Sequence, residues 1–372
     1  MKILHVNTES GWRGGENQIL LLLKGLANLP NVENHAALLQ GSEAEQRLAP
    51  FAMVQPIKQG LTRGLNPDTV MRLAAYCRRE NIQVIDAHSS KGHTLALAIK
   101  MLYPRVKLVV HRRVDNVPGH DPVNNWKYRT KKVDRYIAIS EAIKEVLINS
   151  GVNPDRIDVV HSAVPPHDTT SDERAESRRS LRATFRVPDD HALFGNASAI
   201  SHQKGYDVLL RSCARLQDRG VKFRCLIAGD GPQKSEIQAL AGDLGLTSVV
   251  TFLGFVKDIR PFLQGLDFFV LPSANEGLGT ILLEATYAGL PIIATKVGGI
   301  PEIIEHMITG LLLPPGDEDI LAQHIGTYIK DPLLAATLQR ACREKVLRDF
   351  SIEAMVQGNL RIYRDLTGGG RP

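Results

Sequence analysis

The chain has 372 residues, which is too long for one compact core and suits two domains of ordinary size. Hydrophobic residues make up 43% and charged residues 23%, a globular mixture that excludes a disordered or collagen-like chain. The net charge is +5, and the excess lies in residues 1–165, which hold 22 Lys and Arg against 15 Asp and Glu.

The composition also bears on where the protein resides. No apolar run is long enough for a membrane-spanning helix, and the N-terminus lacks the basic and apolar pattern of a signal peptide. The four cysteines are scattered without a CxxC spacing, so neither a zinc site nor a disulfide framework is predicted. We therefore expect a cytoplasmic protein.

The first half of the chain alternates between short apolar runs and helical patterns. Residues 2–7 predict a strand, and a turn ending in Gly14 and Gly15 leads from it into a helix. Further strands are predicted at 36–39, 54–57, 83–87, 107–111 and 135–139, with helices near 66–80, 91–102 and 141–150. This alternation predicts a parallel sheet covered by helices on both faces.

The alternation breaks where a proline-rich, polar stretch precedes a charged helix, and we interpret 166–190 as a linker. A second series of strands is predicted at 191–196, 222–228, 249–253, 267–271 and 291–294, followed by helices near 332–348 and 351–366. The sequence thus predicts two facing, doubly wound α/β domains, over 1–165 and 191–350. The helix 351–366 is expected to pack back on or near the first domain. Ligands are expected at the carboxyl ends of the strands, in a cleft between the domains.

The most informative segment runs from 271 to 291 and reads LPSANEGLGTILLEATYAGLP. A buried strand leads into a loop with Glu276, and a helix is predicted to begin near Gly279. Free backbone N–H groups at a helix start suit a phosphate. Glu284 follows Glu276 by eight residues, and two carboxylates beside a phosphate pocket suit the hydroxyls of a ribose and of a second sugar. The alternative is that Glu276 only complements the helix dipole and Glu284 is a surface residue.

This segment resembles the E-x7-E signature of retaining glycosyltransferases with the GT-B fold, and nearly the whole chain resembles glycosyltransferase family 4. Supporting motifs occur in the family's order: GGE at 14–16, KG at 204–205, AGDGP at 228–232, FLGFV at 252–256 and GGIPE at 298–302. The resemblance implies two Rossmann-like domains and a nucleotide-diphosphate sugar, UDP- or GDP-linked, as donor. It implies neither a cofactor nor a metal, and no DxD pair lies in a donor loop.

The resemblance also implies a role for each matched residue. Glu276 would hold hydroxyls of the donor sugar, and Lys204 would neutralise the leaving diphosphate, a task that suits an ammonium group. His111, at the end of an apolar strand, would point into the cleft near the donor sugar and completes the predicted catalytic set. The predicted donor-binding residues are Gly14, Gly15, His202, Gly229, Gly231, Val256, Gly277, Leu278, Gly279, Thr280, Ile281 and Glu284.

One position departs from the family pattern. The family usually has an arginine five residues before the lysine, where this sequence has Ala199, so Lys204 has more to do and His202 is expected to compensate. Gly229 and Gly231 lack the full G-x-G-x-x-G spacing and predict a tight turn near the nucleotide. At Val256 the resemblance implies that backbone groups read the nucleobase.

The basic excess concentrates between 105 and 135, with nine basic and three acidic residues. Such a patch favours an anionic partner, and since no nucleic-acid-binding motif accompanies it, no nucleic acid is expected. Trp126 and Tyr128 among the cations suit a membrane interface. We therefore predict an anionic, lipid-linked acceptor, such as a glycolipid or lipopolysaccharide precursor, met at the inner face of the membrane. The predicted acceptor-side residues are Lys91, Arg112, Arg113 and Lys127.

Three other functions fit the same residues. The acceptor could be a small soluble anion held by a few of these cations. A nucleotide-sugar epimerase also uses two facing α/β domains, although the E-x7-E helix argues against it. A non-catalytic module that binds nucleotide sugar is favoured only by Ala199.

Overall fold

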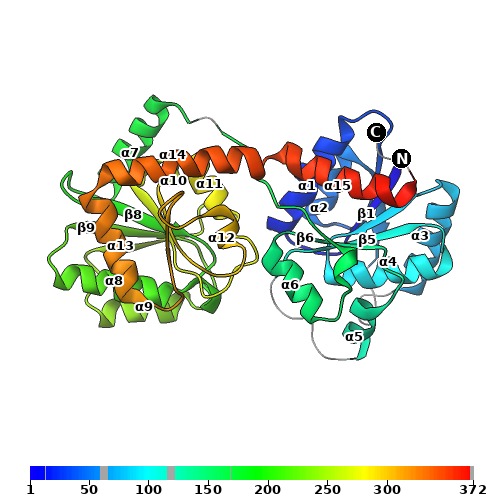
Figure 1. Ribbon diagram of the computed structural model, residues 1–372, viewed down its shortest axis with the longest axis horizontal. Coiled ribbons are helices and arrows are strands. Elements are labelled where there is room, and N and C mark those ends of the chain that lie inside the picture. Colours follow the sequence, from blue (N-terminus) through cyan, green and yellow to red (C-terminus); the bar gives the residue numbers. More distant parts are fainter. Residues whose placement is uncertain (13, 59–65, 115–121, 168, 369–372) are drawn as a thin grey trace. The chain divides into compact units, whose positions relative to one another are not determined.

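The computed structural model describes residues 1–372 except 13, 59–65, 115–121, 168 and 369–372. The chain divides into two compact units (Figure 1). The first unit comprises Met1–Val164 and the residues from Ser351 onward, and the second comprises Pro165–Phe350. Each unit holds one parallel sheet with helices on both faces, so the doubly wound α/β fold predicted from the sequence is confirmed.

The sheet of the first unit has the strand order β3-β2-β1-β4-β5-β6-β7, with every pair parallel. The strands are β1 Lys2–Asn7, β2 Glu33–Leu39, β3 Met53–Ile57, β4 Val84–Ala87, β5 Lys107–Arg112, β6 Arg135–Ala138 and β7 Ile157–Val159. The strand order reverses between β1 and β4. In sheets of this kind, ligands bind outside the carboxyl ends of the strands at such a reversal.

The helices of the first unit are α1 Gly14–Ala27, α2 Glu43–Leu48, α3 Pro67–Arg79, α4 Ser90–Leu102, α5 Pro122–Arg129, α6 Glu141–Asn149 and α15 Ile352–Thr367. The last helix, α15, packs against α1, the first (Figure 1). Its apolar side chains recur at helical spacing and are buried with those of α1 in one core, where Leu22 and Leu26 join Val356 and Leu360. The end of the chain thereby becomes part of the first unit's core.

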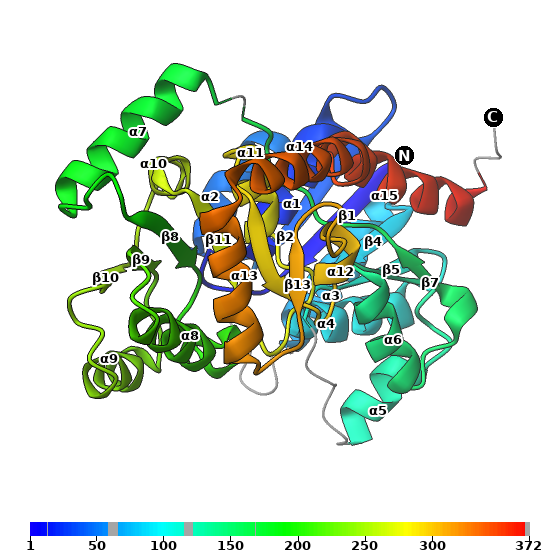
Figure 2. The same cartoon turned by 60° about the vertical axis from the view of Figure 1, so that its left-hand side comes forward.

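The sheet of the second unit has the order β10-β9-β8-β11-β12-β13, again parallel, and reverses between β8 and β11. Its strands are β8 Ala192–Ala197, β9 Phe223–Ala228, β10 Val250–Gly254, β11 Phe268–Leu271, β12 Ile292–Thr295 and β13 Leu311–Leu313. Its helices are α7 Ser171–Thr184, α8 Tyr206–Asp218, α9 Lys234–Asp243, α10 Arg260–Gly265, α11 Ile281–Tyr287, α12 Ile300–Ile303, α13 Glu318–Lys330 and α14 Pro332–Asp349. Helices α8, α9 and α13 cover one face, and α10, α11 and α14 the other (Figure 2).

Three sequence expectations were wrong in detail. The predicted linker, 166–190, belongs to the second unit, because α7 packs along α10 and its buried Arg182 donates to Asp267 Oδ2 at 2.9 Å. Most side chains of α7 are exposed, as the charge of this helix suggests, and Arg182 is the one that is buried. The short strands β7 and β13 were not predicted, and α11 begins at Ile281 rather than near Gly279. None of the helices in the described residues is long and apolar enough to cross a membrane.

Candidate active site

Glu276 lies in the loop after β11, at the strand reversal of the second sheet. Its Oε1 accepts a hydrogen bond from Ser273 Oγ at 3.1 Å and forms an ion pair with Nζ of Lys204. Lys204 comes from the loop after β8, the neighbouring strand, 72 residues away in sequence. Glu276 is only 8% exposed, whereas Lys204 is half-buried. The fold therefore brings the two predicted catalytic residues of this unit into direct contact.

Glycines allow these loops to lie this close. Gly205 has φ +63°, and a Cβ there would lie 2.0 Å from the carbonyl oxygen of Pro272. Gly298 has φ +51°, and a Cβ there would lie 1.7 Å from the carbonyl oxygen of Glu276. Any other side chain at either position would collide with the backbone. Gly205 therefore lets the Lys204 loop lie against the segment before Glu276, and Gly298 lets the loop after β12 lie against Glu276 itself.

Helix α11 begins five residues beyond Glu276, and the side chain of its N-cap residue, Thr280, makes no capping hydrogen bond within the described part of the chain. Glu284 lies in the first turn of α11, and burial raises the pKa of its carboxyl. Among the residues that the structure describes, the carboxylate of Glu284 has no hydrogen-bond or ion-pair partner. A largely buried carboxylate without a partner is costly for the fold and well suited to accept hydrogen bonds from a ligand's hydroxyl groups.

Gly229 and Gly231 follow β9 at the same edge of the sheet, but packing alone explains these glycines. A Cβ at Gly229 would lie 1.9 Å from the carbonyl oxygen of Ser198, and one at Gly231 would lie 2.3 Å from that of Ile200. Both glycines let the loop after β9 meet the loop after β8. Their residue type therefore says nothing about a ligand.

Ala199, which stands where the family usually has an arginine, and the nearby His202 are both exposed to solvent. Ala199 lies in the loop after β8, and His202 has its Nδ1 2.6 Å from Nε2 of Gln233. Val256 is half-buried just after β10, whose last residue, Gly254, accepts a backbone hydrogen bond from Gly229. These residues share the carboxyl edge of the second sheet with Lys204 and Glu276.

In the first unit, Gly14 and Gly15 begin α1 beyond the end of β1. A Cβ at either glycine would meet no described atom within 4 Å, so packing within this unit does not require glycine there. Next to them, Asn7 Nδ2 donates to Glu16 Oε1 at 3.3 Å, and both side chains are buried. Exposed backbone beside a strand reversal agrees with the predicted approach of a ligand.

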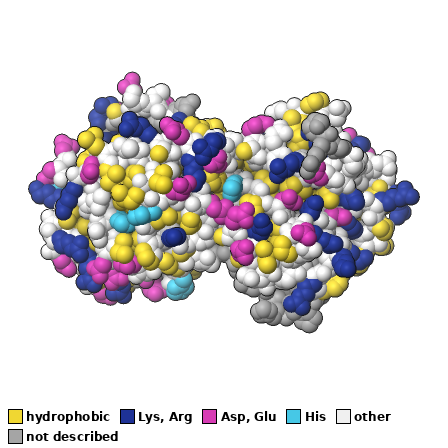
Figure 3. All heavy atoms as spheres, viewed as in Figure 1, with side chains coloured by type: hydrophobic (Ala, Val, Ile, Leu, Met, Phe, Trp, Pro, Cys, Tyr) yellow, Lys and Arg dark blue, Asp and Glu magenta, His cyan; other side chains and the backbone are white. Residues whose placement is uncertain are grey.

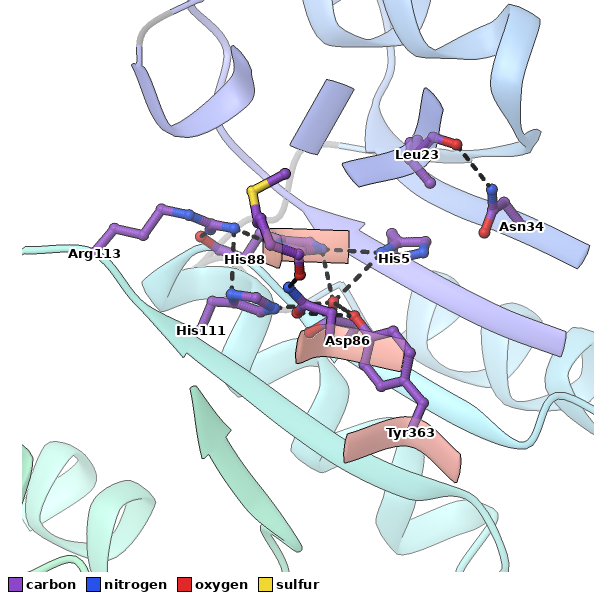
Figure 4. Close-up of polar contacts among 10 residues, drawn as sticks. His5, Leu23, Asn34, Asp86, His88, His111, Arg113 and Tyr363 are labelled. Carbon is purple, nitrogen blue, oxygen red and sulfur yellow. Dashed lines mark hydrogen bonds and ion pairs between the residues drawn. The ribbon is translucent and has the colours of Figure 1, made fainter. Parts of the chain in front are cut away.

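A buried polar network lies at the carboxyl ends of β4 and β5 (Figure 4). At its centre, Asp86 Oδ2 accepts hydrogen bonds from His111 Nε2 at 3.1 Å and from the Tyr363 hydroxyl at 2.6 Å. His88 Nε2 lies 3.2 Å from the same oxygen, and His5 Nδ1 lies 3.5 Å from it. All these side chains are buried, and four separate segments of the chain supply them.

The contacts of Arg113 determine which ring nitrogen of His88 and of His111 carries the proton. Its Nη2 lies 3.0 Å from Nδ1 of His88 and 3.3 Å from Nδ1 of His111. A guanidinium can only donate, so both Nδ1 atoms are acceptors and both rings carry their proton on Nε2, facing Asp86. Arg113, predicted on the acceptor side, is half-buried and holds these two rings.

The charges of the network follow from burial and contact. Burial lowers the pKa of His88 and of His111, and Arg113 adds to this effect, so both rings are neutral at pH 7. Burial alone would raise the pKa of the Asp86 carboxyl, but the imidazoles of His111 and His88 outweigh it and hold this pKa well below the ordinary value. A guanidinium and a carboxylate are therefore joined by two neutral imidazoles.

This network does not fit a metal ion. His5, Asp86 and His88 place potential ligand atoms within 4.8 Å of one another. The hydrogen bond from Arg113 leaves the proton of His88 on Nε2, which is the atom that would have to coordinate the ion. A protonated ring nitrogen has no free lone pair for a metal. The arrangement is a set of hydrogen bonds.

Two predicted acceptor-side residues are buried, which corrects the expectation. Lys127 is 2% exposed and donates to the carbonyl oxygen of Ser90 at 2.8 Å. Arg112 is also buried and donates to the hydroxyl of Tyr128, itself 5% exposed. Charge in the sequence does not reveal which face of a segment it lies on. Arg112, Lys127 and Tyr128 are therefore parts of the first unit's interior.

Other cations of the basic stretch are exposed. Arg129, Lys131 and Lys132 lie on the surface near Trp126, which is 44% exposed, and Lys91 is exposed in the first turn of α4. On the face of the second unit that Figure 3 draws, acidic and basic side chains lie side by side. Arg129, Lys131 and Lys132 form a cluster of the predicted patch that lies on the surface, and Arg105 of the same stretch is exposed as well.

The sequence analysis did not predict roles for Asp86, Tyr363 or Ser273. For Asp86, the usable signal was a charged residue near the end of an apolar strand. For Tyr363, it was the polar pair of Asn359 and Tyr363 on the otherwise apolar face of the last helix. Nothing in the sequence indicated that this face would meet Asp86, since the two residues are 277 positions apart.

Comparisons with known proteins bear on the family and on the fold. The family profile described as "Glycosyl transferases group 1" matches residues 177–345, and the profile "Glycosyltransferase Family 4" matches 12–168. The N-acetyl-alpha-D-glucosaminyl L-malate synthase of Bacillus anthracis is 29% identical over 79% of this chain and 78% of its own. The lipopolysaccharide core biosynthesis glycosyltransferase LpsE of Rhizobium meliloti is 32% identical over 49% of this chain and 52% of its own. The solved structure of Anabaena Alr3699/HepE in complex with UDP has a TM-score of 0.85 at 22% identity and covers 98% of this chain and 100% of its own.

Proposed function

Because the chain belongs to glycosyltransferase family 4, we propose that it transfers a hexose from a nucleotide-diphosphate sugar to a hydroxyl group of an anionic acceptor, with retention of anomeric configuration and without a metal. The observation that carries this proposal is the contact of Lys204 with Glu276 beside the unpartnered Glu284, at the strand reversal of the second sheet. Retention rests on the resemblance of this segment to the E-x7-E signature.

Each group has a chemical task in this proposal. The Lys204 ammonium neutralises the charge that develops on the leaving diphosphate, and the uncapped amides at the start of α11 bind the phosphates. Glu276 accepts hydrogen bonds from sugar hydroxyls, and Glu284 accepts them from the ribose. Uridine is the base that we propose, because the similar HepE structure contains UDP.

The acceptor is proposed to be an anionic, lipid-linked saccharide at the inner face of the membrane. The name of the similar LpsE refers to the lipopolysaccharide core, and Arg129, Lys131 and Lys132 could attract an anionic surface, each contributing about 1 kcal/mol. A second candidate is a small soluble acid, because the similar protein of Bacillus anthracis is named for L-malate.

A thermal-shift screen followed by a transfer assay tests the donor half of the proposal. We expect UDP and one UDP-hexose to raise the unfolding temperature more than GDP does, since a bound ligand stabilises in proportion to its affinity. Wild-type protein and a membrane extract should then transfer labelled hexose, and NMR of the product should show the anomeric configuration of the donor. An inverted product contradicts retention, and an epimerised free sugar nucleotide points to the epimerase alternative.

Vesicle sedimentation tests the acceptor half. Wild-type protein should sediment with anionic vesicles at low salt, and the triple variant Arg129→Gln, Lys131→Gln, Lys132→Gln should not. The control with equal loss of charge is Arg78→Gln, Arg79→Gln, Arg364→Gln, at exposed positions of the first unit outside the basic stretch. Transfer to L-malate without vesicle binding supports the soluble acceptor.

A further inference from the structure

Tyr363 lies on α15, yet its hydroxyl donates to Asp86 Oδ2 at 2.6 Å, a length typical of a hydrogen bond to an anion. Its weaker contact, with Asn359 Oδ1, is 3.4 Å long. Tyr363 is fully buried, and burial, with the neighbouring Asp86, raises the pKa of its phenol well above the ordinary value. The hydroxyl therefore keeps its proton and stays a donor to the carboxylate.

The hydrogen bonds of Asp86 are all on one oxygen. His111 and Tyr363 donate to Oδ2, whereas Oδ1 has no described partner. The orientation of the carboxylate therefore depends on the donors to Oδ2, and the bond from Tyr363 is the shortest of them. Removing the hydroxyl takes away the shortest of these contacts and leaves only the longer ones with His111, His88 and His5 to hold the carboxylate.

The carboxylate in turn orients His111. Both ring nitrogens of His111 are engaged, Nδ1 by Arg113 and Nε2 by Asp86. A flip of the ring would replace both hydrogen bonds by contacts with C–H groups and leave a buried charge unsatisfied. With Nδ1 facing a guanidinium and the Nε2 proton facing a carboxylate, this ring is held in one tautomer and one orientation.

We infer that Asp86 and Tyr363 are positioning residues that hold His111 in its active orientation, so that the last helix of the chain contributes to the reaction through a chain of hydrogen bonds. This inference rests on the proposed function and on the family resemblance, which implies that His111 lies near the donor sugar. Neither Asp86 nor Tyr363 is itself required to touch substrate. Their effect on the reaction passes through His111.

The decisive variant is Tyr363→Phe, which keeps the ring in the core and removes only the hydroxyl. We expect kcat to fall about tenfold, the loss that corresponds to one hydrogen bond to a charged group, with KM for the donor within about twofold of wild type. Asp86→Asn should lower kcat about a hundredfold. The matched control is Tyr136→Phe, another buried tyrosine of this unit, whose hydroxyl donates to the carbonyl oxygen of Lys127 at 3.1 Å.

A second measurement reads the ring itself. The Nε2 proton of His111 should give a slowly exchanging NMR resonance in protein labelled with ¹⁵N-histidine, assigned by its loss in His111→Gln. We expect Tyr363→Phe and Asp86→Asn to shift this resonance and Tyr136→Phe to leave it in place. The inference is overturned if the resonance does not move, or if kcat falls equally in Tyr363→Phe and Tyr136→Phe. Because the resonance is read without substrate, a moved resonance with no sugar transfer by the wild type contradicts only the proposed function.

Discussion

The two units place polar groups at equivalent edges of their sheets but satisfy them in opposite ways. In the first unit, Asp86 and Arg113 each contact the buried imidazoles of His88 and His111, which link the two charged groups. In the second unit, Lys204 and Glu276 form a partly exposed pair, and Glu284 has no described partner. Asp86 and Arg113 at the edge of the first sheet both contact protein partners, whereas the carboxylate of Glu284 at the edge of the second sheet can still accept hydrogen bonds from a ligand.

This difference has an energetic meaning. In the proposed function, a donor bound at the second edge would give Lys204 and Glu276 new partners in place of one another. In the first edge any separation leaves a buried charge unpaired, which costs several times as much. We therefore expect changes at Lys204, Glu276 or Glu284 to weaken ligand binding, and changes within the Asp86 network to reduce the stability or alter the geometry of the first unit.

The largest expected effect is a loss of stability of the first unit in weak acid. Burial lowers the pKa of His35, His88, His93 and His111, so these rings are neutral in the folded unit. Below pH ~6.5 the unfolded chain binds a proton at each of them, and stability falls by about 1.4 kcal/mol per pH unit for each ring. Above that pH these rings are neutral in the folded and in the unfolded chain, so they no longer make stability depend on pH. Trp12 and Trp126, the two tryptophans of the chain, both belong to the first unit, so their fluorescence should report the loss between pH 7.5 and 5.5.

Hydrogen exchange followed by mass spectrometry supplies the comparison for the second unit. Peptides from β8 to β12 should keep their protection over the same pH range, since His324, half-buried there, is the one described histidine of this unit whose pKa burial lowers. Equal loss of protection in both units would contradict the distinction between them.

The next effect is on turnover. Lys204→Ala should lower kcat/KM by about a hundredfold and weaken UDP binding, because a hydrogen-bonded charge on the diphosphate is lost. Initial rates of sugar transfer and calorimetry with UDP measure the two quantities. Lys222→Ala, which removes an exposed lysine paired with Asp190 in the same unit, serves as the control and should keep full activity. Full activity in Lys204→Ala would refute the role of this residue.

Glu284→Gln should separate binding from stability. We expect donor affinity to fall about tenfold, because the ribose loses an anionic acceptor. The free energy of unfolding at pH 7 should rise, since burial raises the pKa of this carboxyl and the native state bears the cost of its charge. That gain should disappear as the pH falls and the wild-type carboxyl takes up its proton. A variant that binds normally, or that is less stable at pH 7, would show that Glu284 has a structural partner.

The smallest expected effect comes from the open glycines. Gly14→Ala and Gly15→Ala should lower donor affinity about threefold to tenfold with an unchanged unfolding temperature, because described atoms leave room for a methyl group at both positions. Gly11→Ala, at an equally open position in the same loop, is the control. A fall in unfolding temperature without a change in affinity would mean that these glycines serve the backbone alone.

The sequence predicted the parallel sheets and the pair of carboxylates because both depend on local patterns. Alternating strands and helices are visible residue by residue, and Glu276 and Glu284 share one short segment. The buried network was not predicted because its members, His5, Asp86 and Tyr363, meet only once the sheet and last helix are packed. Burial of Lys127 was missed for a related reason, since the sequence shows a charge but not the direction in which its side chain lies.

The position of α15 has a consequence for biosynthesis. The second unit is continuous from 165 to 350, so all of its core residues have been translated before those of α15. The first unit, although it begins at Met1, lacks Val356, Leu360 and the hydroxyl of Tyr363 until the last helix has been made. Domains generally fold in the order of their synthesis. Here the unit that leaves the ribosome first is completed last, and until then Leu22 and Leu26 of α1 lack the apolar surface that covers them in the finished protein.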